Sequence, residues 1–233
     1  MHAIKVATYN IRKAVGTDRR RDPARIIEVL REIDADIVAL QEADRRFGNR
    51  MSALPHHMLF EQSNYVPVEI GGRPQSIGWH GNALLVRKGT EVRHSEIVPL
   101  PTLEPRGAVL AEIIMHGRPL RIIGTHLDLS GLWRRRQIRA LLARVDGATH
   151  HLPTVLMGDF NQWSDRGALS EFAFHHHRLV KTPASFHSTR PVARLDRIIV
   201  SHDIDVESCG AHDSALTKRA SDHLPLWASL NIA

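Results

Sequence analysis

The sequence has one cysteine and no long apolar run, and both features exclude classes of protein. Because Cys209 is the single cysteine, no disulfide can form within the chain, and a secreted domain held together by disulfides is excluded. The sequence has no Asn-X-Ser/Thr glycosylation site and no run approaching the roughly 20 apolar residues of a membrane-spanning helix. The N-terminal residues lack the apolar stretch of a secretory leader. These features together predict a cytoplasmic protein.

The composition is that of a globular chain with an excess of basic residues. Of the 233 residues, 42% are hydrophobic and 24% are charged, which excludes a disordered or collagen-like chain. No internal repeat or linker divides the sequence, so we expect one domain over residues 1–233, and we expect it to be a monomer. The net charge of +6 favours a polyanionic partner such as nucleic acid or an anionic membrane surface, although solubility alone would also explain it.

Short apolar strands alternate with a few amphipathic helices. The sequence predicts buried strands at 4–11 and 37–40, and the pair Asp22-Pro23 predicts the start of a helix that continues to about Asp34. Gly117 is expected in a hairpin turn. Further strands are expected at 82–87, 92–98, 108–115, 119–126, 154–157, 195–200, 203–209 and 225–231. Because many strands are joined by short turns, the pattern predicts an α/β (α+β) fold with substantial antiparallel pairing.

Two further helical segments are expected, one after Ser130 and one at about 165–174. The three arginines at 134–136 are expected on the solvated side of the first of these helices. The three histidines at 175–177 lack the spacing of a zinc motif and are expected at the surface, whereas Cys209 is expected to be buried. The predicted buried face of the first helix consists of Leu132, Ile138, Leu141, Leu142 and Val145.

Polar side chains stand where the predicted strands end. Since strand ends at one edge of a sheet converge in space, this edge is the expected place for a functional site. Taken singly, such residues are common in other roles, because a Gly-Asp pair after a strand usually forms a turn and a Ser-Asp pair often forms a cap. In chain order the residues are Asn10, Glu42, His126, Asp159, Asn161, Asp196, Asp222 and His223.

The carboxylates and amides of this set suit metal-assisted attack of water on a phosphate. Glu42 and Asn10 offer the oxygen ligands that Mg²⁺ prefers. Such an ion neutralises a phosphate oxygen and favours the charge that develops in the transition state. Asp159 is a candidate to orient or deprotonate the attacking water.

The remaining groups suit phosphate binding and proton transfer. Asn161 and His126 can donate hydrogen bonds to phosphoryl oxygens. His223 can take or give a proton while a carboxylate such as Asp196 holds it in one tautomer.

Six segments, in this order along the chain, resemble the motifs of the endonuclease/exonuclease/phosphatase superfamily of metal-dependent phosphoesterases. This superfamily includes exonuclease III-like repair nucleases, pancreatic deoxyribonuclease, neutral sphingomyelinases and inositol polyphosphate 5-phosphatases. The resemblance covers essentially the whole chain. The matching segments are Thr8-Tyr9-Asn10-Ile11, Ala39-Leu40-Gln41-Glu42, Gly124-Thr125-His126-Leu127, Gly158-Asp159-Phe160-Asn161, Leu195-Asp196-Arg197-Ile198 and Ser221-Asp222-His223-Leu224-Pro225.

The resemblance implies a four-layer α/β sandwich, with two packed mixed β-sheets flanked by helices. It also implies a site for Mg²⁺ or Mn²⁺ formed by Glu42, Asn10 and Asp222. Either Asp159 or His223 would act as the base, and the resemblance leaves that choice open. The other implied site residues are His126, Asn161 and Asp196 in catalysis and Asn82 in substrate binding. Arg106 and Arg12 are further candidates for substrate binding, because a guanidinium can bind phosphate through two hydrogen bonds.

Three departures from the family pattern narrow the expected function. Arg12 stands where apurinic endonucleases commonly carry an acidic or amide residue, and His126 stands where they carry tyrosine. The Trp-Cys pair that precedes Leu195-Asp196 in inositol phosphatases is absent. The sequence therefore predicts a metal-dependent phosphodiester hydrolase, most simply a nuclease that acts on DNA or RNA. The alternative substrate is a phospholipid headgroup or a small phosphorylated metabolite.

Overall fold

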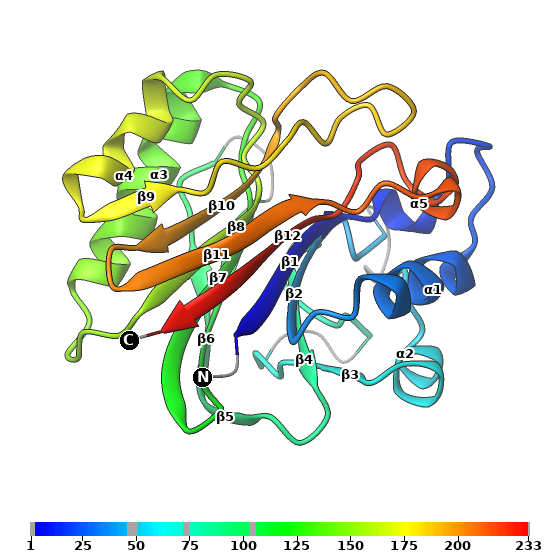
Figure 1. The fold of residues 1–233 in the computed structure, drawn as a ribbon, viewed down its shortest axis with the longest axis horizontal. Coiled ribbons are helices and arrows are strands. Elements are labelled where there is room, and N and C mark those ends of the chain that lie inside the picture. The colour runs from blue at the N-terminus through cyan, green and yellow to red at the C-terminus, as the bar shows by residue number, and fades with distance from the viewer. Residues whose placement is uncertain (1–2, 46–50, 72–74, 103–105, 233) are drawn as a thin grey trace.

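A computed structural model describes residues 3–45, 51–71, 75–102 and 106–232. Two six-stranded mixed β-sheets pack face to face, and helices cover the outer face of each sheet (Figure 1). The predicted four-layer α/β sandwich is therefore confirmed. No helix in the described ranges combines the length and the apolar character that crossing a bilayer requires.

The first sheet contains both ends of the described chain. Its strands are β1 (Ile4–Asn10), β2 (Ile37–Gln41), β3 (Tyr65–Pro67), β4 (Ala83–Arg87), β11 (Ile204–Ala211) and β12 (Leu226–Ile232). Their order is β11-β12-β1-β2-β4-β3, with β1 and β2 parallel and the other neighbours antiparallel. Three helices lie on its outer face (Figure 1), namely α1 (Pro23–Ile33), α2 (His56–Gln62) and α5 (Ala215–Ala220).

The second sheet has the same plan, with one parallel pair at its centre. Its strands are β5 (Glu91–Pro99), β6 (Gly107–Met115), β7 (Arg118–His126), β8 (Thr154–Asp159), β9 (His177–Leu179) and β10 (Asp196–Ser201). Their order is β5-β6-β7-β8-β10-β9, and β7 and β8 are the parallel pair. The outer face carries α3 (Gly131–Asp146), α4 (Glu171–Phe174) and the short 3-10 helix η2 (Gly167–Ser170), while a second 3-10 turn, η1 (Arg12–Ala14), follows β1.

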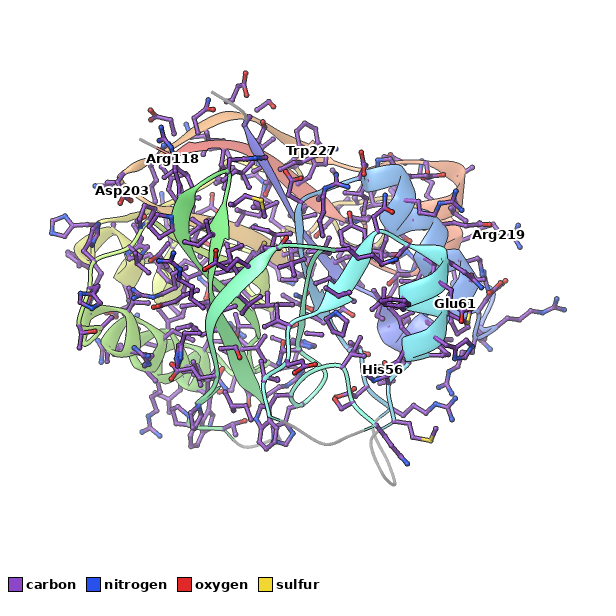
Figure 2. All side chains as sticks on the ribbon, turned by 90° about the horizontal axis from the view of Figure 1, so that it is seen from below. His56, Glu61, Arg118, Asp203, Arg219 and Trp227 are labelled. Carbon is purple, nitrogen blue, oxygen red and sulfur yellow. The ribbon has the colours of Figure 1, made fainter. Side chains whose placement is uncertain are left out.

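Alternation along the strands builds separate cores on the two faces of each sheet. In β1 and β2, Val6 and Ile37 pack into the core between the sheets. Their neighbours Ala7 and Val38 face the other way and pack beneath α1. This is the two-residue period of a strand that is buried on both faces. Side chains fill the space between the two sheets (Figure 2).

Helix α1 begins and ends where the sequence predicts. The Asp22 carboxylate accepts hydrogen bonds from the backbone N–H groups of Ala24 at 3.1 Å and Arg25 at 3.4 Å. Such an N-cap stabilises a helix by about 1 kcal/mol, and Pro23 needs no hydrogen-bond partner in the first turn. The helix ends at Asp34, whose φ of +47° cannot continue it.

The predicted hairpin joins β6 to β7. Its two loop residues, His116 and Gly117, have φ values of +50° and +78°. Positive φ at both central positions is typical of a type I′ turn, whose twist matches that of the flanking strands.

Three burial predictions are wrong. Leu132 is 61% exposed, because its six-residue spacing from Ile138 places it on a different side of α3. Cys209 is only half-buried, because it lies on β11, the edge strand of its sheet. His177 is buried rather than at the surface, because β9 pairs with β10 and the ring packs edge-on against Phe172.

Candidate active site

Both parallel strand pairs end at the same edge of the molecule, and the polar residues of both sheets meet there. In the first sheet, Asn10 at the end of β1 lies beside the end of β2, which Glu42 follows. In the second sheet, Asp159 is the register partner of both His126 and Asp196. The Asn10 side chain bridges the sheets, because its Nδ2 donates to Asp159 Oδ2 at 3.0 Å.

Asp159 lies at the centre of this group and is 2% exposed. Its Oδ1 accepts a hydrogen bond from the Asn161 backbone N–H at 2.9 Å, and its Oδ2 accepts the one from Asn10. The same Oδ2 lies 3.4 Å from His126 Nε2 and 3.9 Å from His223 Nε2. Both carboxylate oxygens are therefore held in fixed directions, with two imidazoles facing one of them.

The turn after β8 depends on a glycine and on a strained asparagine. A Cβ atom on Gly158 would lie 1.8 Å from the Thr125 carbonyl oxygen, so glycine is needed for the close approach of β7 and β8. Asn161 has a φ of +50°, and its Nδ2 donates to the Leu127 carbonyl at 2.9 Å. Glu42 also has a positive φ, +53°. Each such residue costs on the order of 1 kcal/mol, and strain of this kind is concentrated at functional sites.

His223 is held by a buried carboxylate. Its Nδ1 lies 2.8 Å from Asp196 Oδ2, which also accepts a hydrogen bond from the Ser185 hydroxyl. Burial is the largest single influence on the pKa of His223 and lowers it, but the charge and hydrogen bond of Asp196, together with the charges of Asp159 and Asp222, outweigh burial and raise the pKa to about 10. The imidazole is therefore charged at neutral pH, and its Nε2 points at the Asp159 side of the site.

His126 is buried equally well but has the opposite character. Burial lowers its pKa to about 3, and the Asp159 carboxylate opposes this shift without overcoming it, while the positive charge of Arg106 adds to it. His126 is therefore neutral at physiological pH. The site thus contains one charged and one neutral imidazole, both facing the same carboxylate.

Glu42 and Asp222 each pair with a cation from the turn after β1. Lys13 Nζ donates to Glu42 Oε2, and Arg12 Nε lies 3.2 Å from Asp222 Oδ2. The Asn10 Oδ1 atom accepts a hydrogen bond from the Arg12 backbone N–H at 3.1 Å. Two carboxylates and an amide oxygen therefore lie in a region where the fold already places positive charge.

Three buried groups lie close enough to hold a metal ion. One oxygen each of Asp159 and Asp196 and one nitrogen of His223 lie within 4.8 Å of one another. Within the described residues this is the one such group of three.

Asn82 and Arg106 lie at the start of strands beside the site. Asn82 is fully buried, and its Nδ2 donates to the Gly107 carbonyl at 3.0 Å and to the Trp79 carbonyl at 3.4 Å. Arg106 directly precedes β6, whose first residues pair with the end of β7. Both residues therefore lie beside the site residues predicted from the sequence. The hydrogen bond from Asn82 to Gly107 also connects the start of β4 to the start of β6.

Three residues of the site were not singled out from the sequence. Ser185 holds Asp196, and Lys13 holds Glu42. Ser221 Oγ donates to the Asn10 carbonyl at 2.7 Å and accepts from the His223 backbone N–H at 3.3 Å. Ser221 could have been found, because it belongs to the Ser-Asp-His segment. Ser185 and Lys13 carry no recognisable signal.

Comparison with known sequences decides the family. Residues 7–223 match the sequence profile of the endonuclease/exonuclease/phosphatase family. The chain belongs to this family. The Escherichia coli protein YbhP, which is uncharacterised, is 28% identical over 256 residues, a match that covers 99% of this chain and 97% of YbhP.

Solved structures of endonuclease/exonuclease/phosphatase proteins share the fold. A family protein from Bacteroides vulgatus superposes with a TM-score of 0.79 at 20% identity, covering 100% of both chains. The D. rerio protein TDP2, solved in complex with a single-strand DNA product, superposes with a TM-score of 0.75 at 17% identity, covering 98% of this chain and 99% of TDP2. At these identities the likeness shows the common fold, and the family membership supports a phosphoesterase activity.

Proposed function

We propose that this endonuclease/exonuclease/phosphatase protein is a divalent-metal-dependent phosphodiester hydrolase that acts on nucleic acid. The observation that carries the proposal is the position of Asp159, whose Oδ2 accepts a hydrogen bond from Asn10 and faces two imidazoles. A fixed carboxylate next to proton donors is the arrangement that attack of water on a phosphate requires.

In this proposal Asp159 orients and deprotonates the attacking water. His223, held by Asp196 and charged at neutral pH, donates a proton or a charged hydrogen bond from Nε2 to a phosphate or leaving-group oxygen. His126 is neutral, and together with the Asn161 amide it donates hydrogen bonds to phosphoryl oxygens. The two imidazoles thus have different roles because their surroundings set different charges.

The residues around Glu42 fit a hard divalent cation. The donors are the Glu42 carboxylate and the Asn10 carbonyl oxygen, with the Asp222 carboxylate nearby, and Mg²⁺ and Mn²⁺ favour such oxygen ligands. The contact of the Lys13 ammonium with Glu42 supports a cation-binding role for that carboxylate. The chemistry that such an ion supplies when bound is neutralisation of a phosphate oxygen. The Asp159, Asp196 and His223 group suits proton transfer better, because Asp196 Oδ2 is already occupied by two hydrogen bonds.

Three residues are proposed to bind the substrate phosphate. Arg12 and Arg106 provide guanidinium groups beside the site, and guanidinium binds phosphate through two parallel hydrogen bonds. Asn82 contributes through its position next to Gly107. Nucleic acid is supported by these arginines, by the net charge of +6 and by the DNA bound to the related TDP2.

Cleavage of plasmid DNA tests the proposal. With Mg²⁺ or Mn²⁺ the wild-type protein should cut the plasmid, EDTA should stop the reaction, and Asp159→Ala purified in parallel should be inactive. Glu42→Gln should need a metal concentration about 10–100 times higher for the same rate. If wild type and Asp159→Ala cut equally, the DNA activity belongs to a contaminant and the proposal fails.

A phospholipid headgroup is the second candidate substrate, and one observation favours it. Several large apolar side chains are exposed on the loops around the site and at the start of α3. Leu129 and Leu132 follow β7, and Trp163, which is 67% exposed, follows Asn161. Val192 lies on the adjoining loop, which the ion pair between Arg194 and Asp165 joins to the Trp163 loop at 3.5 Å. Exposed apolar groups near a cationic site suit a lipid surface.

Salt and one double substitution distinguish the two substrates. Cleavage of duplex DNA should weaken steeply as salt is raised. Leu132→Ser with Trp163→Ser should leave DNA cleavage within about threefold of wild type, because these side chains lie outside the catalytic group. If the double variant instead loses hydrolysis of phospholipid vesicles while DNA is never cut, the lipid is the substrate.

A further inference from the structure

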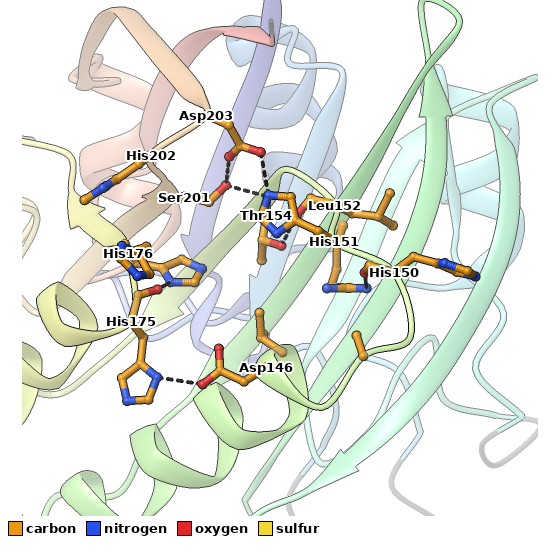
Figure 3. A pocket seen from close by; sticks show the side chains of 14 residues that line it. Asp146, His150, His151, Leu152, Thr154, His175, His176, Ser201, His202 and Asp203 are labelled. Carbon is orange, nitrogen blue, oxygen red and sulfur yellow. Dashed lines mark hydrogen bonds and ion pairs between the residues drawn. The ribbon is translucent and has the colours of Figure 1, made fainter.

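A pocket, drawn in Figure 3, includes Thr154 and Ser201 in its lining. Thr154 begins β8 and Ser201 ends β10, so the pocket lies at the opposite end of these strands from Asp159 and Asp196. It has a volume of about 440 Å³ and lies between the end of α3, the start of β8 and the end of β10. Its lining includes two carboxylates and Arg121, whose guanidinium is neutralised by Glu112 at 2.8 Å. Six histidines also line it, namely His150, His151, His175, His176, His177 and His202.

His177 is the buried histidine of this pocket. It is 5% exposed, and its Nδ1 lies 2.6 Å from the His175 carbonyl oxygen. Because a carbonyl oxygen can only accept, Nδ1 carries the proton and Nε2 carries a lone pair. That Nε2 is buried and has no hydrogen-bond partner within the described part of the chain. A metal-binding histidine has this arrangement, with one nitrogen bonded to a carbonyl and the other left as a ligand.

Carboxylates orient two further imidazoles around the pocket. His175 Nδ1 lies 2.6 Å from Asp146 Oδ2, and His151 Nε2 lies 3.1 Å from Asp203 Oδ2 (Figure 3). Among the described residues, the other nitrogen of each of these rings has no hydrogen-bond partner. The two carboxylates favour a cation over an anion, and a set rich in imidazole favours Zn²⁺, Cu²⁺ or Ni²⁺ over Mg²⁺.

We propose that this histidine pocket binds a transition-metal ion of the Zn²⁺ type, with His177 Nε2 as the buried ligand and exposed imidazoles such as His151 and His202 completing the site. The imidazole nitrogens of the pocket are farther apart than the ligand atoms of Asp159, Asp196 and His223. Because one ion must contact several of these nitrogens, the exposed imidazoles would rotate toward His177 when the ion binds. The ion would link the 150–151 loop, β9 and the β10–β11 turn, and would stabilise the fold.

The pocket is separate from catalysis. It borders Thr154, the first residue of β8, whereas Asp159 is the last. Five residues of strand span about 16 Å, so an ion here does not reach the phosphate. The proposal therefore does not depend on the proposed hydrolase function.

Zinc titration of the purified metal-free protein tests the proposal. Zn²⁺ affinity is measured by competition with a coloured chelator, and thermal unfolding is followed with and without Zn²⁺. His151→Ala with His202→Ala should weaken Zn²⁺ binding by roughly 100-fold and abolish the rise in Tm. Both side chains are exposed, so the double variant should fold.

A matched control uses two exposed histidines elsewhere. His56 and His57 begin α2, and Figure 2 shows His56 and Asp203 at opposite sides of the molecule. His56→Ala with His57→Ala should bind Zn²⁺ as wild type does. If both double variants lose affinity equally, or neither does, the proposal is wrong.

Two further readouts identify the ligands. Co²⁺ bound in the pocket should give the visible absorption bands of nitrogen coordination, which an oxygen-rich site lacks. His177→Phe keeps a ring against Phe172 but removes the nitrogen, and these bands should disappear from it while Asp159→Asn retains them. If the bands survive in His177→Phe and vanish in Asp159→Asn, the ion binds at the active site and the proposal is overturned.

Discussion

The two ends of β8 and β10 carry similar side chains in different surroundings. At one end, Asp159, Asp196 and His223 are all buried and lie in contact with one another. At the other end, His151 Nε2 lies 3.1 Å from Asp203 Oδ2, and this imidazole is exposed. Histidine and aspartate are paired at both ends, but the His223–Asp196 pair is buried whereas the His151–Asp203 pair is open to solvent, and electrostatic interactions are stronger where water is excluded.

His223 at the catalytic end and His177 at the other end show how neighbouring groups change the pKa of a buried histidine. His223 and His177 are 6% and 5% exposed, so burial is nearly the same. Burial lowers the pKa of His223, but the charge and hydrogen bond of Asp196, with the charges of Asp159 and Asp222, together outweigh burial and raise the pKa to about 10. The pKa of His177 is lowered by burial, because its closest partner is a neutral carbonyl. At nearly equal burial, the charges of the neighbouring groups therefore decide whether the pKa of an imidazole is raised or lowered.

Replacing the central carboxylate should have the largest effect. Asp159→Asn should lower kcat for a phosphodiester such as bis(p-nitrophenyl) phosphate by about 10³-fold, because the attacking water loses its base. Asp203→Asn, at the opposite end of β10, should stay within about twofold of wild type. If Asp159→Asn kept more than about a tenth of the activity, Asp159 would not be the base.

Removing the charge beside His223 should have the next largest effect. Asp196→Asn should lower kcat by about 10²-fold, because the imidazole loses both its orientation and its charge. In the proposed mechanism the charged form of His223 is the active one, so the rate should fall as pH rises through the pKa of His223, near 10 in the wild type. Without Asp196 that pKa falls toward its ordinary value.

The alkaline side of the pH–rate profile should therefore move to lower pH in Asp196→Asn. The measurement is kcat between pH 5 and pH 10 for both proteins at saturating metal. An unchanged alkaline side would show that the deprotonation seen in the profile belongs to another group.

The smallest effects are expected from replacing two serines, Ser185 at the catalytic end and Ser201 at the other end, and these two variants should differ in kind. Ser185 donates to Asp196 at the catalytic end, and Ser201 donates to Asp203 at the other end while accepting from the Thr154 N–H at 2.8 Å. Ser185→Ala should lower kcat several-fold, since one hydrogen bond to a charged group is worth about 1.5–3 kcal/mol at most. Ser201→Ala should destabilise the fold by about 1–3 kcal/mol, because the buried Thr154 N–H loses its partner.

Urea unfolding and kcat measured on both serine variants check this prediction. A loss of stability without loss of activity is expected for Ser201→Ala, and a loss of activity is expected for Ser185→Ala. Equal activities in the two variants would contradict the assignment of Ser185 as a positioning residue for His223.

Local sequence patterns predicted the features that depend on neighbouring residues. Asp22-Pro23 and Asp34 marked the ends of α1, and Gly117 marked the β6–β7 turn, because capping and turn formation involve residues a few positions apart. The polar strand ends were also visible, because each follows an apolar run. The position of the candidate site therefore followed from the sequence.

The burial of individual side chains could not be predicted as directly from the sequence. Leu132 belongs to an apolar pattern but lies off the buried side of α3, and His177 belongs to a polar run but lies inside. Both outcomes depend on which surface packs against the element, and a local pattern contains no information about that surface.

By itself, the sequence determined ten of the strands, the Gly117 turn, the motif residues and the family, but not the short strands β3 and β9 or the helices α2 and α5. Only the tertiary structure decided that Ser185 holds Asp196, that Asn10 reaches Asp159 and that six histidines share one pocket. Asn10 and Asp159 are 149 residues apart, and they meet because two sheets pack with their parallel strand pairs ending at the same edge. Contacts of that kind are set by topology and packing, and the burial and charged neighbours that result set the charges of His126 and His223.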